Sequence, residues 1–146
     1  MNPEPAGWYQ NLLKSSYSRM GWSYYEKGRF EEAIPFLKEA IRIDPTSSWH
    51  QGLLGAAYYR MGNLEEAIPF LKEAISLWPD NLQAHVVLAA AYSLAGRMEE
   101  AHAQTEDILR IDPEFSLEDI ANYEHFYFLK GDKERFSNAL RKAGLK

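Results

Sequence analysis

The sequence predicts an all-α fold, a superhelix of about eight helices packed as antiparallel pairs. The first observation is an internal repeat, because the string from Glu31 to Ile41 recurs unchanged from Glu65 to Ile75, an offset of 34 residues. The second is helical periodicity, since apolar residues recur at intervals of three and four within each copy. The third is that helix-ending residues recur at the same offset: a glycine ends the first helix of each copy, and a proline follows the second helix.

Composition narrows the functional classes. The chain has 146 residues, of which 46% are hydrophobic and 25% are charged, as is typical of a globular domain. It has no cysteine, so neither a disulfide nor a thiolate metal site can form. The formal net charge of -5 disfavours nucleic-acid binding, which depends on lysine and arginine. No apolar run reaches the ~18 residues that a membrane helix needs. We therefore expect neither a nucleic-acid partner nor a membrane.

Residues 1–13 are expected to be an N-terminal lead-in or helix extension. Their first part, Met1 to Gly7, lacks the basic and apolar regions of a signal peptide, so we expect a cytoplasmic protein. The apolar residues of this segment have two alternative roles: they extend the first helix and pack on the protein itself, or they pair two copies as a homodimer. They are Trp8, Tyr9, Leu12 and Leu13.

Three repeats follow, at residues 14–47, 48–81 and 82–115, and each is expected to form two antiparallel helices. Such a thin pair cannot bury both of its faces, so neighbouring pairs must stack. The second repeat shows the apolar stripe of its first helix at Leu54, Ala57, Tyr58 and Met61, and that of its second helix at Leu64, Ala67, Ile68, Leu71 and Ile75.

The helix ends carry recognisable signals. Gly62 suits the left-handed position that ends a helix, and Asn63 with Glu66 has the spacing of a capping box for the next helix. Pro35 and Pro69 lie inside their helices, where proline removes a backbone hydrogen bond. We predict that both helices continue with a modest kink.

Residues 116–146 do not keep the repeat motif, but they keep its alternation of two helical segments with helix-ending residues between them. Ser116 with Asp119 predicts a helix start, and this helix is expected to run to about Leu129. Asp132 is placed to cap a last helix. We expect these residues to form an atypical capping helix pair that closes a single domain.

The motif positions resemble the tetratricopeptide repeat (TPR) family. The first copy matches with Tyr17, Met20, Gly21, Tyr24, Gly28, Ala33, Leu37, Ala40 and Pro45. The second matches with Gln51, Leu54, Gly55, Tyr58, Gly62, Ala67, Leu71, Ala74 and Pro79. The third matches with His85, Leu88, Ala89, Tyr92, Gly96, Ala101 and Pro113, but Thr105 and Ile108 depart from the motif. The resemblance implies a right-handed α-α superhelix, a TPR solenoid, with a degenerate second helix in the third repeat that packs differently.

The resemblance also implies a function. In this family the first helix of each pair lines a concave groove that binds peptides, so the chain is expected to be a protein-protein interaction module or scaffold. The expected partner is another protein or peptide of apolar or amphipathic character. Carried to this sequence, the main groove candidates are Ser18, Trp22, Tyr25, Trp49, Gly52, Ala56, Tyr59, Arg60, Gln83, Val86 and Ala90. The remaining groove positions fall on Ser15, Glu26, Ser93, Leu94, Ile120, Glu124 and Tyr127.

Two interpretations stay open for the aromatic candidates. Trp22, Tyr25 and Trp49 either anchor a partner, as exposed aromatic residues commonly do, or pack between neighbouring pairs. For Tyr59 and Arg60 we expect the groove.

One TPR subtype is not expected. Co-chaperone members of the family bind an acidic C-terminal tail with lysine, asparagine and arginine side chains. The matching positions here are Ser18, Trp22, Leu53, Gln83 and Val87, and none of these side chains is a cation that could clamp a carboxylate.

A second resemblance concerns the end of the chain, from Leu140 to Leu145, which is similar to tails that close some bacterial repeat modules. Such modules often follow a class III nucleotide cyclase or a winged-helix domain. This implies an alternative function as a regulatory or oligomerisation segment of a larger bacterial signalling protein.

No catalytic arrangement stands out. The histidines lack the spacing of a metal site, and no nucleophile motif surrounds any serine. The acidic pair Glu31 and Glu32, like its counterparts in the other copies, lies where it complements a helix dipole. We expect no enzymatic activity, no cofactor and no metal.

Overall fold

The computed structural model describes residues 7–122 and 132–146, with residues 121 and 122 described by their backbone only. This part of the chain folds into eight α-helices and contains no strand, which confirms the predicted all-α class. The helices are α1 (Gly7–Glu26), α2 (Phe30–Ile43), α3 (Ser48–Arg60), α4 (Leu64–Leu77), α5 (Leu82–Leu94), α6 (Met98–Ile111), α7 (Leu117–Asn122) and α8 (Lys133–Lys142).

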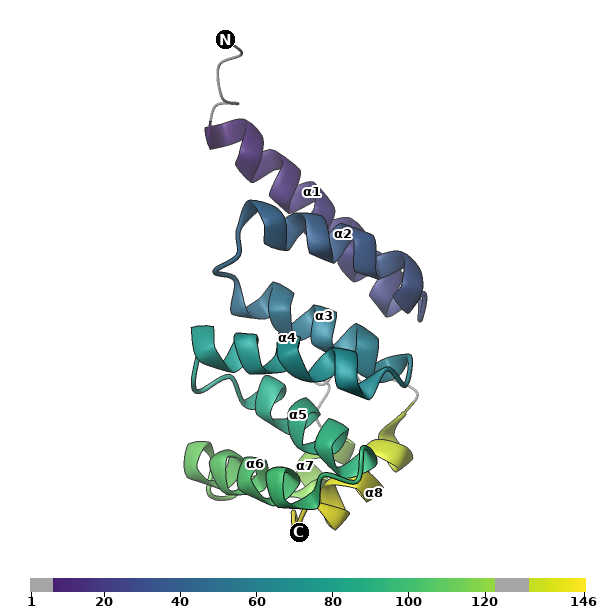
Figure 1. The fold of residues 1–146 in the computed structure, drawn as a ribbon, viewed down its shortest axis with the longest axis vertical. Coiled ribbons are helices and arrows are strands. Elements are labelled where there is room, and N and C mark those ends of the chain that lie inside the picture. Colours follow the sequence, from purple (N-terminus) through teal and green to yellow (C-terminus); the bar gives the residue numbers. More distant parts are fainter. Residues whose placement is uncertain (1–6, 123–131) are drawn as a thin grey trace.

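The first six helices form three antiparallel pairs that stack one on the next (Figure 1). Packing within each pair is the most extensive, followed by packing of α2 on α3 and of α4 on α5. The most buried helix is α5, because it receives neighbours on several sides. Each pair thus covers the apolar flank that its neighbour leaves open.

Glycine allows the helices of the first two pairs to approach closely. A Cβ atom at Gly55 would lie 2.6 Å from Cγ of Leu71 and 3.2 Å from the carbonyl oxygen of Ala67. A Cβ atom at Gly21 would lie 2.8 Å from Cδ2 of Leu37 in the same way. Real Cβ atoms do not show such distances, so a side chain at either position would force the facing leucine to move, and at Gly55 it would also crowd the backbone of α4.

In the third pair, α5 and α6 make the equivalent helix–helix contact with different residues. Ala89 takes the position of Gly55, and Thr105 takes that of Leu71. The larger residue on one helix is therefore matched by a smaller residue on the other. Helix α6 has the 14 residues of α2 and α4, and Thr105 is buried at the same register as Leu71. The departure from the motif is accommodated without loss of the helix.

The turn between α3 and α4 depends on Gly62, whose φ of 82° is left-handed. The N–H groups of Gly62 and Asn63 donate to the carbonyl oxygens of Tyr59 and Tyr58, both at 2.9 Å. Asn63 precedes α4 but its side chain makes no capping hydrogen bond, so the predicted capping box is wrong. Its φ of -86° and ψ of 69° do not explain the missing bond, because Asn81, with a φ of -69° and a ψ of 87°, accepts from the Ala84 N–H and so caps α5.

Both internal prolines are accommodated. Helix α2 continues through Pro35 to Ile43, and α4 continues through Pro69 to Leu77. The continuity of both helices is therefore confirmed, whereas the kink stays a prediction.

The capping signal at Ser116 is confirmed. The Ser116 backbone N–H donates to Oδ2 of Asp119 at 2.7 Å, and the Asp119 N–H donates back to Oγ of Ser116 at 3.4 Å. The predicted continuation of this helix to Leu129 lies outside the described residues. Asp132 precedes α8 without a side-chain capping bond, so the predicted cap there is wrong.

Helix α8 packs against α7 and more extensively against α5 (Figure 1). Three of its residues, Phe136, Ala139 and Leu140, are buried. The segment after it is held by hydrogen bonds, since Oγ1 of Thr105 lies 2.9 Å from the carbonyl oxygen of Ala143 and the Leu117 N–H donates to the Lys146 carbonyl at 3.0 Å. The last helix therefore covers part of α5 rather than only ending the stack.

No helix among the described residues combines the length and apolarity needed to cross a lipid bilayer.

Candidate peptide-binding groove

The candidate groove is built by α1, α3 and α5, the first helices of the three pairs. Its open part begins with Trp22 and Trp49, whose ring centroids lie 6.0 Å apart. Trp22 also stacks on Tyr25, with centroids 6.0 Å apart and planes only 7° from parallel. Trp49 keeps 42% of its surface exposed. The half-buried Trp22 ring thus supports the exposed Trp49 ring, and Tyr25 packs beneath.

We call Trp22 and Trp49 the aromatic shelf. Small residues lie beside it. Gly52 is half-buried, and a Cβ atom there would meet the Cβ of Ala74 at an ordinary 3.8 Å. Packing therefore does not demand glycine at this position, in contrast to Gly55. A small hollow of about 20 Å³, enough for one water molecule, lies at Trp49, Gly52, Leu53, Ala56, Leu71, Asn81, Gln83, Ala84 and Val87.

A polar pair sits between α1 and α3. The Ser18 hydroxyl donates to the Lys14 carbonyl at 2.7 Å, so its oxygen accepts a hydrogen bond from Nε2 of His50 at 2.6 Å. His50 is buried, and this burial lowers its pKa below the ordinary value of 6.5. Its Nδ1 has no hydrogen-bond partner among the described residues. The sequence did not identify His50, because its spacing to Ser18 carries no motif.

Tyr25 and Arg60 form the next layer. The Tyr25 side chain is buried and hydrogen-bonded to Arg60, and its burial raises the pKa of the phenol. The Arg60 guanidinium lies over the ring of Phe30, 4.9 Å from its centroid. Phe30 in turn meets Tyr25 edge-on, with centroids 5.0 Å apart. Arg60 is therefore engaged with the chain's own aromatic residues at the edge of the groove.

The expectation that Tyr59 stands open in the groove is wrong in this structure. Its ring is fully buried and meets the ring of Phe136 edge-on, with centroids 5.9 Å apart. Burial raises the pKa of Tyr59, and its hydroxyl has no hydrogen-bond partner in the part of the chain described. The reason is α8, whose position the sequence did not predict. The sequence did contain a signal for this packing, the apolar stripe of Phe136, Ala139, Leu140 and Ala143. Such a stripe has to be buried against another apolar surface of the protein.

The structure separates the other candidates into open and covered positions. Ser15, Glu26 and Trp49 are exposed, and Ser18, Trp22, Gly52, Arg60 and Gln83 are half-buried. The buried candidates are Tyr25, Ala56, Tyr59, Val86, Ala90, Ser93 and Ile120. Glu124 and Tyr127 lie outside the described residues.

A second, more polar cleft of about 600 Å³ lies where the end of α5 meets α8. Ser93 and Leu94, both predicted groove residues, border it together with Asp132, Glu134, Arg135, Asn138, Ala139 and Lys142. No group of acidic, histidine or cysteine side chains in residues 7–122 and 132–146 is arranged to hold a metal ion.

Comparisons with known proteins agree with this architecture. One family model, described as tetratricopeptide repeat, matches residues 61–121, and a second, described as TPR repeat, matches residues 21–62. A comparison with curated protein sequences gave no significant match.

Solved structures show the same superhelical fold. The second TPR domain of human RPAP3, in complex with the HSP70 peptide SGPTIEEVD, aligns with a TM-score of 0.73 and 20% identity over 94% of this chain and 99% of that chain. The TPR2B domain of yeast Sti1, in a complex with pHsp70, aligns with a TM-score of 0.70 and 17% identity over 91% and 97%. The crystal structure of MamA aligns with a TM-score of 0.69 and 25% identity over 89% and 75%. The repeat, the stacked helix pairs and these matches together place the chain in the tetratricopeptide repeat family.

Proposed function

We propose that this protein is an interaction module that holds a segment of another protein against the aromatic shelf. The observation that carries the proposal is Trp49, which is 42% exposed while its ring rests on Trp22. A large ring held in place by a neighbour loses little conformational freedom when it binds, and such rings are common anchors of protein contacts.

The known uses of the fold support this class of function. TPR domains of human RPAP3 and yeast Sti1 occur in complexes with chaperones or their peptides. We infer a different ligand chemistry for this chain. Leu53 and Val87, at two of the five positions that clamp an acidic tail in co-chaperones, are buried aliphatic residues, and Ser18 is already bonded to His50.

The expected ligand is an apolar or amphipathic segment. The chain's own α8 supports this preference, since it packs on α5 and buries Phe136, Ala139 and Leu140, with Phe136 against Tyr59. Gly52 next to the shelf presents no side chain of its own, so a ligand can approach the backbone of α3 there. The open half of the groove would then accept a short helix or strand alongside the shelf.

The test uses a displayed library of random 15-residue peptides, selected on the wild-type protein. The selected peptide is then titrated against wild type, Trp49→Ala and the matched control Trp78→Ala, whose tryptophan is 57% exposed at the end of α4. We expect Trp49→Ala to weaken binding at least tenfold, about 1.4 kcal/mol, and Trp78→Ala to leave it unchanged. Equal binding by Trp49→Ala and wild type would contradict the proposal.

A defined negative probe tests the ligand chemistry. The HSP90 peptide SRMEEVD, to which the first TPR of Spaghetti (RPAP3) is bound, has three acidic residues among its last four. We expect no saturable binding of this peptide to the present chain below about 1 mM. Tight binding would show that the groove recognises a carboxylate by other residues.

A further inference from the structure

The first helix is longer than its counterparts. Helix α1 has 20 residues, whereas α3 and α5, at the same place in their pairs, have 13 each. The extra length lies at the start: Nζ of Lys14 is 3.2 Å from Oδ2 of Asp44, the residue that follows α2. Residues 7–13 therefore extend about 10 Å beyond the end of α2. We call them the α1 overhang (Figure 1).

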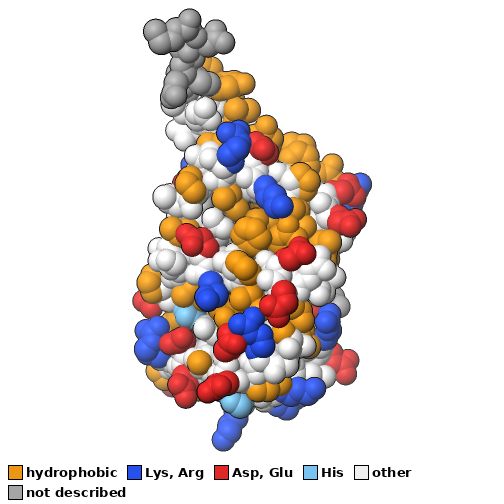
Figure 2. Space-filling model, in the orientation of Figure 1, with side chains coloured by type: hydrophobic (Ala, Val, Ile, Leu, Met, Phe, Trp, Pro, Cys, Tyr) orange, Lys and Arg blue, Asp and Glu red, His pale blue; other side chains and the backbone are white. Residues whose placement is uncertain are grey.

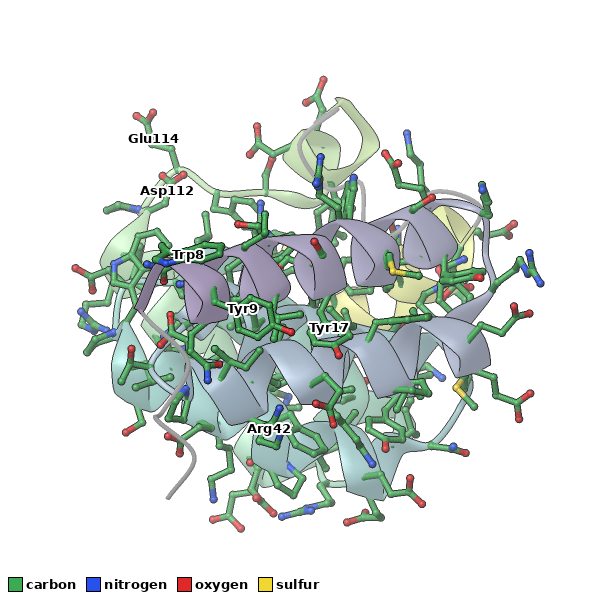
Figure 3. All side chains as sticks on the ribbon, turned by 90° about the horizontal axis from the view of Figure 1, so that it is seen from above. Trp8, Tyr9, Tyr17, Arg42, Asp112 and Glu114 are labelled. Atoms are coloured by element: carbon green, nitrogen blue, oxygen red, sulfur yellow. The ribbon has the colours of Figure 1, made fainter. Side chains whose placement is uncertain are left out.

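The overhang exposes large apolar side chains. Trp8 is 70% exposed, Leu12 is 54% exposed and Tyr9 is 42% exposed. Trp8 and Leu12 are four residues apart, so they lie on one face of the helix, with Tyr9 beside them. Figure 3, seen from this end, labels Trp8 and Tyr9 at the start of α1, and Figure 2 shows hydrophobic side chains over the same turns. Packing within the described chain does not explain this stripe.

The overhang is also uncharged. Residues 7–13 contain no Asp, Glu, Lys or Arg, although 25% of the chain is charged and its net charge is -5. Two copies of an acidic chain repel each other at most orientations. The neutral overhang is a surface to which residues 7–13 bring no charge of their own.

We propose that the α1 overhang pairs with the overhang of a second copy, antiparallel about a two-fold axis. A two-fold contact brings the same patch together from both chains, so Trp8 of each copy meets Leu12 of the other. The three exposed side chains offer about 350 Å² per chain, on the order of 700 Å² in total, less than the ~1,200 Å² of a standard stable interface. The dimer is therefore weak and depends on concentration. It shares no residue with the aromatic shelf, so the two proposals succeed or fail separately.

Sedimentation velocity of the full chain tests the pairing, from about 10 µM to about 1 mM, the range of weak complexes. Wild type and the control Trp78→Gln should sediment faster as concentration rises. The double variant Trp8→Gln with Leu12→Gln should need at least ten times the concentration to dimerise, with an unchanged helical circular dichroism spectrum. Monomeric wild type throughout, or loss of the dimer in Trp78→Gln alone, would overturn the proposal.

Cross-linking tests the symmetry of the contact, because the chain has no cysteine of its own. Asn11 is exposed in the overhang, and Asn63 is likewise exposed in the turn before α4. Asn11→Cys should form a disulfide-linked dimer at least ten times faster than Asn63→Cys under the same oxidant, and equal rates would overturn the pairing. A separate experiment measures binding to vesicles of phosphatidylcholine and phosphatidylserine. If monomeric wild type binds them through Trp8, the overhang contacts a lipid surface and the dimer proposal is overturned.

Discussion

The ring of Phe136 in α8 meets the ring of Tyr59 in α3 edge-on, with centroids 5.9 Å apart and planes at 79°. The two residues are far apart in sequence, and their contact covers a position that the TPR motif assigns to the binding groove. The candidate groove is therefore divided. One part keeps the aromatic shelf open, and the other is occupied by the chain's own last helix.

The first prediction concerns the Tyr59 hydroxyl, which is buried without a hydrogen-bond partner among the described residues. A buried polar group without a partner opposes folding, so Tyr59→Phe should keep the free energy of unfolding or raise it by up to about 1 kcal/mol. Urea denaturation measures this value. As a control, Phe136→Ala removes the other ring and should lower the free energy of unfolding by about 3 kcal/mol. A clear loss of stability in Tyr59→Phe would mean that the hydroxyl has a partner.

The second prediction compares two glycines of the same helix. Gly52→Ala should raise the free energy of unfolding by about 0.5–1 kcal/mol, because alanine favours the helix and its Cβ meets only an ordinary contact at 3.8 Å. Gly55→Ala should lower it by about 1–3 kcal/mol, because its Cβ would lie 2.6 Å from Cγ of Leu71. Urea denaturation of the two variants provides the comparison.

The pair Ala89 and Thr105 supplies a control for that explanation. If the contact between helices causes the loss, Leu71→Thr should reduce the additional cost of Gly55→Ala, with a coupling of at least about 0.5 kcal/mol in a double-mutant cycle. Additive effects would show that the close approach to Leu71 is not the cause.

The third prediction concerns pH and His50. Burial lowers its pKa below 6.5, so in the unfolded chain this histidine binds a proton at a higher pH than in the folded chain. His50 therefore contributes its full stability above about pH 6.5, and this contribution is lost as the pH falls toward the folded pKa. Nearby Asp44 opposes the shift and Lys14 adds to it, but burial is the largest cause.

The measurement is the difference in the free energy of unfolding between wild type and His50→Gln, taken from pH 8 to pH 5. Glutamine does not titrate, so the difference isolates His50 from the other groups. We expect wild type to lose stability relative to His50→Gln below about pH 6.5. A difference that stays constant, or that changes in favour of wild type at low pH, would contradict a buried neutral histidine.

The fourth prediction concerns the residue that follows α4. At the equivalent positions after α2 and α6, Oδ1 of Asp44 accepts from the Thr46 N–H at 3.1 Å, and Oδ1 of Asp112 accepts from the Glu114 N–H at 3.2 Å. Trp78 cannot accept such a bond and is 57% exposed. Trp78→Asp should therefore raise the melting temperature by a few degrees, from about 0.5–1 kcal/mol of added turn stability. Trp78→Ala adds no acceptor and should not raise the melting temperature. A lower melting temperature for Trp78→Asp would show that packing of the Trp78 indole stabilises the fold.

The sequence by itself determined the helices and their pairing, because these depend on local spacing. The 34-residue repeat, the left-handed turn at Gly62 and the cap at Ser116 act over a few residues and need no distant partner. The capping prediction at Asn63 failed, although Asn81 caps α5 from similar backbone angles.

Only the tertiary structure decided which groove residues are exposed. Trp49 stays open and Tyr59 is covered, although both hold groove positions of the same motif. The contact of His50 with Ser18 likewise joins residues from different helix pairs. Exposure depends on which segment packs against a residue, and that segment can be as far away as α8. Local periodicity predicts that α8 buries one face against an apolar surface. Which surface that is depends on the packing of the whole chain.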